Sequence, residues 1–297
     1  QRRFGDVAAG LRVTGAGRTD AQVHALGQAI SFDLPEDCVA STGPGEALPE
    51  LQHQLNSILP TDVRLWNVTS APAPTMANVS YAGEARELRE MPWHAIHSAK
   101  AKLYVYHFSV AKVPNPLARR HRAHFFRLNA EKMEIFARCL ALFEGTHDFK
   151  SFANRAQRQP VPRNSVRQVY SARLIPEGGD DYRVEILLSG ALYKMVRNVV
   201  GFCEAVAAGE LPLEAFDEVK ALQDRRKNPA KSAPPEGLLL AHVCYDHYGP
   251  VTELTDIGSG DSAAASTAPA ADERLGVGLG SRFHKRERDE RYGSGSG

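Results

Sequence analysis

Hydrophobic and polar positions alternate in several stretches of this chain, which is the pattern of strands with one buried face. The clearest run, residues 103–110, has an apolar face formed by Tyr104, Tyr106, Phe108 and Val110. Alternation, β-branched residues and flanking turn residues predict strands at 28–32, 63–68, 103–110, 166–174, 182–188 and 237–245. The Pro- and Gly-containing residues 176–180 predict a hairpin turn between two of them.

Apolar residues spaced three and four apart predict helices over 51–59, 130–143 and 192–208. In the last helix the apolar stripe is Met195, Val199, Phe202 and Val206. Arg197 lies about 200° from Met195 at about 100° per residue, and Gly201 leaves space one turn later. An arginine beside such a gap could reach into a cleft or remain solvated. Residues 71–92 show no clear period, which predicts a loop with a single helical turn.

The composition is that of a globular protein with an appended tail. The chain has 297 residues, 43% of them hydrophobic, enough for one large or two modest domains. It has no run of about 18 apolar residues and no charged-then-apolar leader, so neither a membrane span nor secretion is predicted. The four cysteines are widely separated, which favours reduced, buried thiols over a disulfide framework or zinc ligands: Cys38, Cys139, Cys203 and Cys244.

The net charge of +1 gives no overall attraction to nucleic acid, so an RNA-binding protein would need local basic patches. Two clusters meet this need, one formed by Arg119, Arg120 and Arg122, the other by Arg155, Arg158, Arg163 and Arg167. Phe125 and Phe126 follow the first cluster, and rings that stack on bases beside guanidinium groups that meet phosphates suit an RNA surface. A solvated charged face explains each cluster equally well.

The stretch from Gly15 to Phe32 carries the strongest chemical signal. Two glycines allow a close backbone approach, and Arg18 and Asp20 follow two residues apart, on the same side of an extended loop. A guanidinium beside the carboxyl group would keep Asp20 ionised. The alternative is an ordinary turn leading into a strand, because Gly, Thr and Asp are common turn residues.

This stretch resembles the active-site signature of the TruA-type tRNA pseudouridine synthases, AGRTDAGVHA followed by GQ and a phenylalanine. Nine of the ten signature positions agree, and Gln22 stands where the family carries glycine. Four further stretches resemble the same family in the same order: 102–106, 145–152, 195–201 and 233–240. Together they cover most of residues 10–246.

The resemblance implies an α+β fold: a mixed, largely antiparallel central sheet built from two similar halves, flanking helices and a central cleft. It divides the chain into an N-terminal half with the signature loop, 1–110, and a C-terminal half, 111–248. A Gly-, Ser- and Ala-rich polar tail, 249–297, cannot form a core. Because only 14 residues precede Gly15, the family's first strand and helix are expected to be missing from this sequence.

The resemblance also implies a reaction, the isomerisation of uridine to pseudouridine, which needs no cofactor and no metal. Asp20 would be the essential carboxylate, and Arg18 would occupy the space that an extruded base vacates. Tyr104 and Leu238 would sandwich the uracil, while Arg197 would support Asp20 or hold a phosphate. Such enzymes are commonly homodimers that act on structured RNA, here the tRNA anticodon arm, with Arg119, Arg120, Arg122, Arg155 and Arg158 as RNA contacts.

Three departures from the family pattern favour a different function. They are Gln22, Ile96 in place of an arginine, and the short N-terminus, and they suit a catalytically inactive RNA-binding protein, for example a ribosome assembly factor bound to rRNA. A glycosidase is a further alternative, but that chemistry usually needs a pair of carboxyl groups, and no second acid stands in a comparable motif. The polar tail suggests a eukaryotic protein, and the cytoplasm, nucleus and mitochondrion all stay open.

Overall fold

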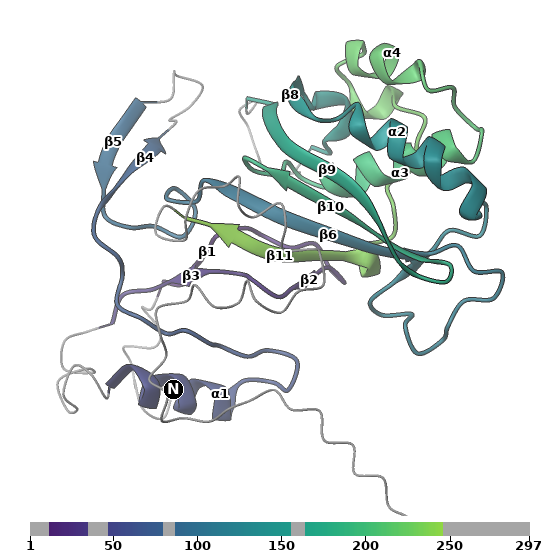
Figure 1. Ribbon diagram of the computed structural model, residues 1–297. Coiled ribbons are helices and arrows are strands. Elements are labelled where there is room, and N and C mark those ends of the chain that lie inside the picture. Colours follow the sequence, from purple (N-terminus) through teal and green to yellow (C-terminus); the bar gives the residue numbers. More distant parts are fainter. Residues whose placement is uncertain (1–11, 35–46, 80–86, 156–163, 246–297) are drawn as a thin grey trace, which may run out of the picture. The chain divides into compact units, whose positions relative to one another are not determined.

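The computed structural model describes residues 12–34, 47–79, 87–155 and 164–245. Within these residues, seven strands form one mixed sheet in the order β2-β11-β6-β10-β9-β8, with β7 paired to β6 (Figure 1). Its strands are β2 His24–Ala25, β6 Ala101–Ser109, β7 Ala123–His124, β8 Gly145–Asp148, β9 Val166–Gly178, β10 Asp181–Leu188 and β11 Leu238–Cys244. The parallel pairings, β2 with β11 and β7 with β6, both involve two-residue strands, so the sheet is largely antiparallel as expected.

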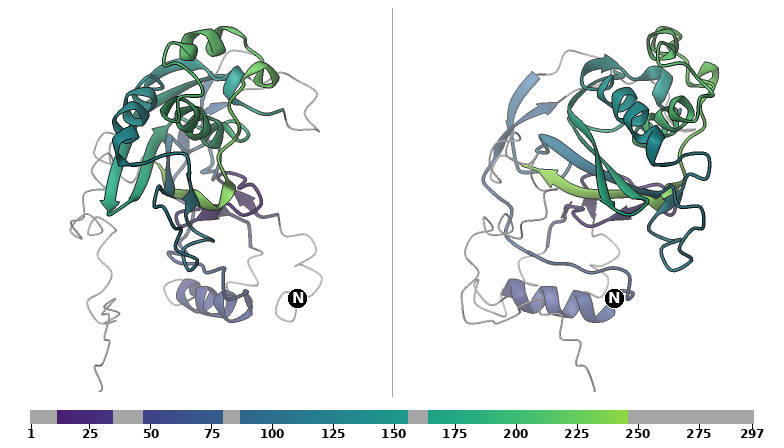
Figure 2. Two further views of the ribbon diagram at one scale, coloured as in Figure 1. Left: turned by 90° about the vertical axis from the view of Figure 1, so that its right-hand side faces the viewer. Right: turned by 45° about the vertical axis from the view of Figure 1, so that its right-hand side comes forward.

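Helices α2 Met133–Ala141 and α3 Met195–Ala207 cover one face of this sheet, and α4 Ala215–Ala221 packs beside them (Figures 1 and 2). Both long predicted helices are confirmed, although residues 130–132 of the first form a 3-10 turn. Every residue of α3 except Glu204 is buried, so the predicted stripe was too narrow. One reason is that a segment at 231–233 packs against the side of α3 that carries Arg197 and Gly201.

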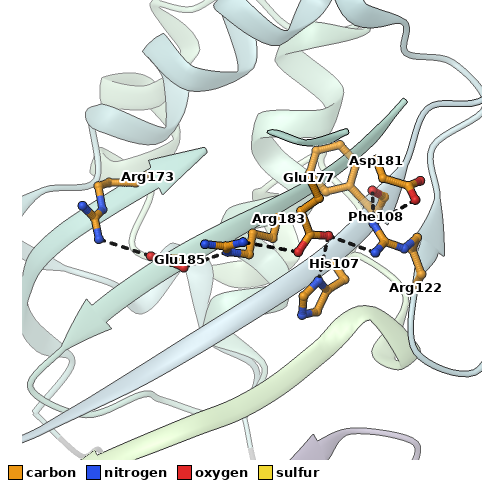
Figure 3. Close-up of polar contacts among 8 residues, drawn as sticks. All are labelled: His107, Phe108, Arg122, Arg173, Glu177, Asp181, Arg183 and Glu185. Carbon is orange, nitrogen blue, oxygen red and sulfur yellow. Dashed lines mark hydrogen bonds and ion pairs between the residues drawn. The ribbon is translucent and has the colours of Figure 1, made fainter. Parts of the chain in front are cut away.

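Strands β9 and β10 form the predicted hairpin, and β10 explains why the two faces of the sheet differ. Its apolar residues Tyr182, Val184 and Ile186 belong to the core under the helices. The alternate residues Arg183 and Glu185 lie on the other face, where they pair with each other and with their neighbours across the strands (Figure 3). That face therefore carries a ladder of ion pairs, next to a smaller apolar cluster that includes Leu103, Val105 and Leu187.

Two predictions between residues 60 and 92 were wrong. The predicted strand at 63–68 is irregular, because side chains of helix α1 Ala47–Ile58 satisfy its backbone: the Asn56 side chain bonds both Leu65 N and Leu65 O at 2.7 Å, and Gln52 accepts from Val68 N at 3.1 Å. The predicted loop at 71–92 contains a hairpin, β4 Thr75–Val79 and β5 Glu87–Met91. These two strands pair only with each other in the described chain, and their sequences show no regular alternation of apolar and polar residues.

Several predictions concern residues outside the described ranges. They include the expected loss of a first strand and helix, the polar tail, Cys38, Arg158 and Arg163. Cys139, Cys203 and Cys244 are buried free thiols, as predicted. No helix in the described ranges is long and apolar enough to cross a membrane. The domain boundary at residue 110 stays a prediction, and the sheet places β6, before it, between β11 and β10, after it.

Candidate active site

The signature loop, residues 15–23, is held first by the chain that directly follows it. Strands β1 Thr14–Gly15 and β3 Ile30–Ser31 pair on either side of it, and Ala16 N donates to Ala29 O at 2.8 Å. The Gln28 amide bonds Gly17 twice: its Nε2 donates to Gly17 O at 2.6 Å, and its Oε1 accepts from Gly17 N at 3.2 Å. A side-chain amide that satisfies both backbone groups of one residue fixes the loop where it turns.

Lys102 of strand β6 ties the loop to the central sheet. Its Nζ donates to Ala16 O at 2.7 Å and would lie only 3.3 Å from a Cβ at Gly17, so a side chain at that position would crowd the ammonium group. Burial, and next the nearby charge of Arg167, lower the pKa of Lys102. A hydrogen bond from a charged donor to a backbone carbonyl is strong, and this one fixes the distance between the loop and β6.

The chain that follows the loop contacts strand β11, which lies next to β6 in the sheet. Leu26 N and Gly27 N both donate to Leu240 O, at 2.9 and 3.2 Å. A side chain at Gly27 would overlap with the backbone of Ala241, so only glycine permits this approach. The signature residues 24–27 therefore dock the loop against the strand that neighbours Tyr104.

Asp20 pairs with Arg197 of helix α3, where the two side chains meet at 3.0 Å, Arg197 Nη1 to Asp20 Oδ2. The side chain of Asp20 is 22% exposed and that of Arg197 only 10%. The spacing in the signature suggested Arg18 as the partner of Asp20, and the family resemblance suggested Arg197. Arg18 is exposed, and Arg197, 177 residues further along the chain, makes the pair. A charge pair this well shielded from water is stronger than an exposed one.

The space predicted beside Arg197 is filled by protein. A Cβ at Gly201 would overlap with Lys231 O, because the segment 231–233 runs directly against this side of α3. That segment holds the arginine: Arg197 Nε donates to Ala233 O at 2.8 Å, and Ala233 N donates to Arg197 O at 2.9 Å. The glycine therefore serves close packing, and the packing aims the guanidinium at Asp20.

Tyr104 lies close enough to Asp20 for the carboxylate to affect the pKa of its phenol. Burial first, and then the Asp20 carboxylate, raise the pKa of the Tyr104 phenol to about 12. In the register of β6 and β11, Leu240 lies opposite Tyr104, while Leu238 lies opposite Tyr106 and is 6% exposed. Both leucines are on the face of the sheet that carries the two tyrosines. The sequence analysis did not identify Leu240 as the neighbour of Tyr104.

Comparison with known proteins decides the family. A family profile described as "tRNA pseudouridine synthase" matches residues 140–246. "tRNA pseudouridine synthase A 1" of Protochlamydia amoebophila is 36% identical over 79% of this chain and 80% of its own length. "tRNA pseudouridine synthase A" is 35% identical in Chlamydia trachomatis and 30% in Lacticaseibacillus casei, over 78% and 83% of those proteins. This chain belongs to the tRNA pseudouridine synthase family.

Membership confirms the TruA-type resemblance, the α+β fold and the reaction class: the protein is an isomerase that forms pseudouridine in tRNA. The relatives compared above are bacterial. Within the described parts of the chain, no group of three or more His, Cys, Asp or Glu side chains could hold a metal ion.

The pseudouridine synthase motif at 195–201 contains a second buried polar residue that sequence reasoning missed. Asn198 Nδ2 donates to Phe152 O at 2.8 Å and to Asn154 Oδ1 at 3.0 Å, and its Oδ1 accepts from the Ser232 hydroxyl. Asn198 is 1% exposed, so its amide joins α3 to two separate segments inside the protein. Its place beside Arg197 in the matched motif was the available signal.

The first arginine cluster divides into exposed and paired members. Arg119 and Arg120 are exposed, whereas Arg122 pairs with Glu177 at 2.9 Å and with Asp181 at 3.5 Å (Figure 3). The backbone of Arg120 is bonded to the signature region, because His24 Nε2 lies 2.6 Å from Arg120 O. The loop that carries the exposed arginines is thus fastened at both the β9–β10 hairpin and the signature region.

The aromatic pair beside this cluster also divides. Phe125 is 1% exposed and packs against Phe108, so it belongs to the core and the prediction that it faces RNA was wrong. Phe126 is 77% exposed, with the Arg127 guanidinium 5.9 Å from its ring centroid. Of the second arginine cluster, Arg155 is exposed and Arg158 lies outside the described residues.

Proposed function

We propose that this protein isomerises uridines of the tRNA anticodon arm and that Asp20 is the essential carboxylate. The observation that carries the proposal is the Asp20–Arg197 ion pair, 3.0 Å long and partly buried, beside Tyr104. A carboxylate paired with a guanidinium on a braced loop suits a reaction that must break a glycosidic bond without a cofactor. The family's reaction is that isomerisation, which gives the site its substrate class.

In this proposal the N1 glycosidic bond breaks, the uracil turns, and C5 bonds to C1′, after which C5 loses its proton and N1 gains one. Asp20 either attacks C1′ or removes a ribose proton. Because the pKa of Tyr104 is about 12, its phenol is neutral at pH 7 and acts as a stacking surface and hydrogen-bond donor, not as a base. Leu238, on the same face of the sheet as Tyr104, would add to the apolar wall beside the base.

Exposed cations would hold the RNA. Arg18 is exposed and would enter the space left by the extruded nucleotide. Arg119, Arg120 and Arg155 would meet phosphates, as would Arg158, whereas Arg122 would fix their loop through Glu177. Binding of this kind weakens steeply as salt rises. We also propose a homodimer; rRNA as substrate and a mitochondrial location are less favoured, because the relatives are named for tRNA and are bacterial.

The test is to map pseudouridine in tRNA incubated with wild type, with Asp20→Asn and with Asp33→Asn. The last variant is the control, because Asp33 is an exposed acid outside the signature loop. We expect wild type and Asp33→Asn to convert anticodon-arm uridines and Asp20→Asn to convert none while binding the same tRNA. Conversion by Asp20→Asn at the wild-type rate would overturn the role of Asp20. Binding without conversion by all three proteins would favour an inactive RNA-binding member.

A further inference from the structure

Tyr106, the second tyrosine of strand β6, is fully buried and yet keeps its hydroxyl group hydrogen-bonded. It is 0% exposed, and its hydroxyl donates to Pro234 O at 2.8 Å. A Cβ at Gly237 would lie 2.8 Å from the end of its ring, so the neighbouring 3-10 turn Pro235–Gly237 is packed directly onto the tyrosine. The ring is therefore enclosed, and its hydroxyl has a definite partner.

The acceptor of this hydrogen bond belongs to the segment that holds Arg197. Ala233, directly before Pro234, accepts from Arg197 Nε at 2.8 Å and donates to Arg197 O at 2.9 Å. Pro234 and Pro235 have no N–H group, so this stretch cannot attach itself through backbone donors. Its polar attachments are the bonds at Ala233, the bond from the Ser232 hydroxyl to Asn198, and the tyrosine hydroxyl at Pro234.

We propose that the Tyr106 hydroxyl is a positioning group for the Arg197–Asp20 ion pair. It acts through Pro234 and Ala233 and does not touch the substrate. The proposal rests on the proposed function of Asp20. Without the hydroxyl, the half-buried Pro234 O loses its hydrogen-bond partner in the protein and the segment shifts to find another. Arg197 then loses the fixed carbonyl that orients its Nε, and its Nη1 no longer meets Asp20 at the same distance.

The electrostatics agree with this geometry. Burial first, and then the carboxylates of Glu236 and Glu204, raise the pKa of Tyr106, while the charge of Arg197 acts in the opposite direction. The phenol is therefore a neutral donor at every pH at which the enzyme would be assayed. A phenylalanine at this position would fill the same space, so the chemical difference is the hydrogen bond alone.

The test compares Tyr106→Phe with Tyr245→Phe. Tyr245 is a matched control, because it is 3% exposed and its hydroxyl donates to another backbone oxygen, Ala95 O, at 2.7 Å. Steady-state assays on tRNA give kcat and KM, and circular dichroism checks that all proteins are folded. In proteins with ¹⁵N-labelled arginine, the solvent exchange rate of the Arg197 Nε–H is measured, with the signal assigned by its loss in Arg197→Lys.

We expect Tyr106→Phe to lower kcat about 5- to 30-fold with KM within about twofold, and to speed exchange of the Arg197 Nε–H; Tyr245→Phe should do neither. An unchanged exchange rate in Tyr106→Phe would overturn the proposal, as would an equal loss of kcat in both variants. If wild type forms no pseudouridine, the proposed function fails, while the exchange rates still decide whether the hydroxyl positions Arg197.

Discussion

Gln22 holds a backbone conformation that favours glycine, which makes Gln22→Gly an informative substitution. Its φ is 68°, in the left-handed region, and Val23 N donates to Asp20 O at 3.1 Å across the turn. This combination matches a type II turn with Gln22 at the third position, where glycine is preferred. Gln22 is exposed, so a change of its side chain alters few contacts.

The size of the effect follows from two opposing terms. A left-handed conformation destabilises a residue with a Cβ by about 1–2 kcal/mol, and glycine removes this cost. Glycine also has more freedom in the unfolded chain, which destabilises the folded state by about 0.5–1 kcal/mol. Gln22→Gly should therefore raise the free energy of unfolding by about 0.5–1 kcal/mol. For a protein of this size that corresponds to a rise in Tm of about 1–3 °C.

The assay is thermal unfolding of a series of substitutions of Gln22, followed by pseudouridine formation on tRNA. Tm should be highest for Gln22→Gly and then fall through Gln22→Asn and wild type to Gln22→Val, because asparagine tolerates the left-handed region and a β-branched side chain does not. Gln22→Ala is the control, because it removes the long side chain but keeps the Cβ, so its Tm should not rise. The glycine variant should keep its activity. An equal rise in Tm for alanine and glycine, or a fall for glycine, would refute the strain argument.

Three other consequences of the structure can be measured. Burial raises the pKa of Tyr104 to about 12, above the value of about 10 for a tyrosine in the unfolded chain. The stabilising contribution of the phenol is therefore complete below pH of about 10 and is lost as pH rises through about 12. Ultraviolet titration of wild type, compared with Tyr104→Phe, should show one additional phenol with that late midpoint. Gly201→Ala should lower the free energy of unfolding in urea by about 2 kcal/mol or more, because its Cβ would overlap with the backbone of Lys231. Gly15→Ala is the control: its Cβ would have its nearest neighbours at 3.8 Å, and the free energy of unfolding should change by about 0.5 kcal/mol at most. Glu177→Gln weakens the ion pair with Arg122 and should raise KM for tRNA several-fold with kcat unchanged, because the arginine loop loses an anchor.

The sequence alone determined the features that depend on neighbouring residues. The strand at 103–110 and the hairpin around 176–180 were confirmed, although β9 continues through Gly178, because a two-residue period and a local turn need no distant partner to be recognised. The signature stretch was likewise sufficient to identify the family, because its glycines and charged side chains are contiguous.

Tertiary structure decided what each of these residues meets. Asp20 pairs with Arg197, 177 residues away, and not with the adjacent Arg18. Phe125 is buried and Phe126 exposed, although they are neighbours of one type, because the former packs under β6. The space beside Gly201 is occupied by a segment 30 residues further along. Packing brings such groups together through contacts distant in sequence, and local periodicity carries no information about those contacts.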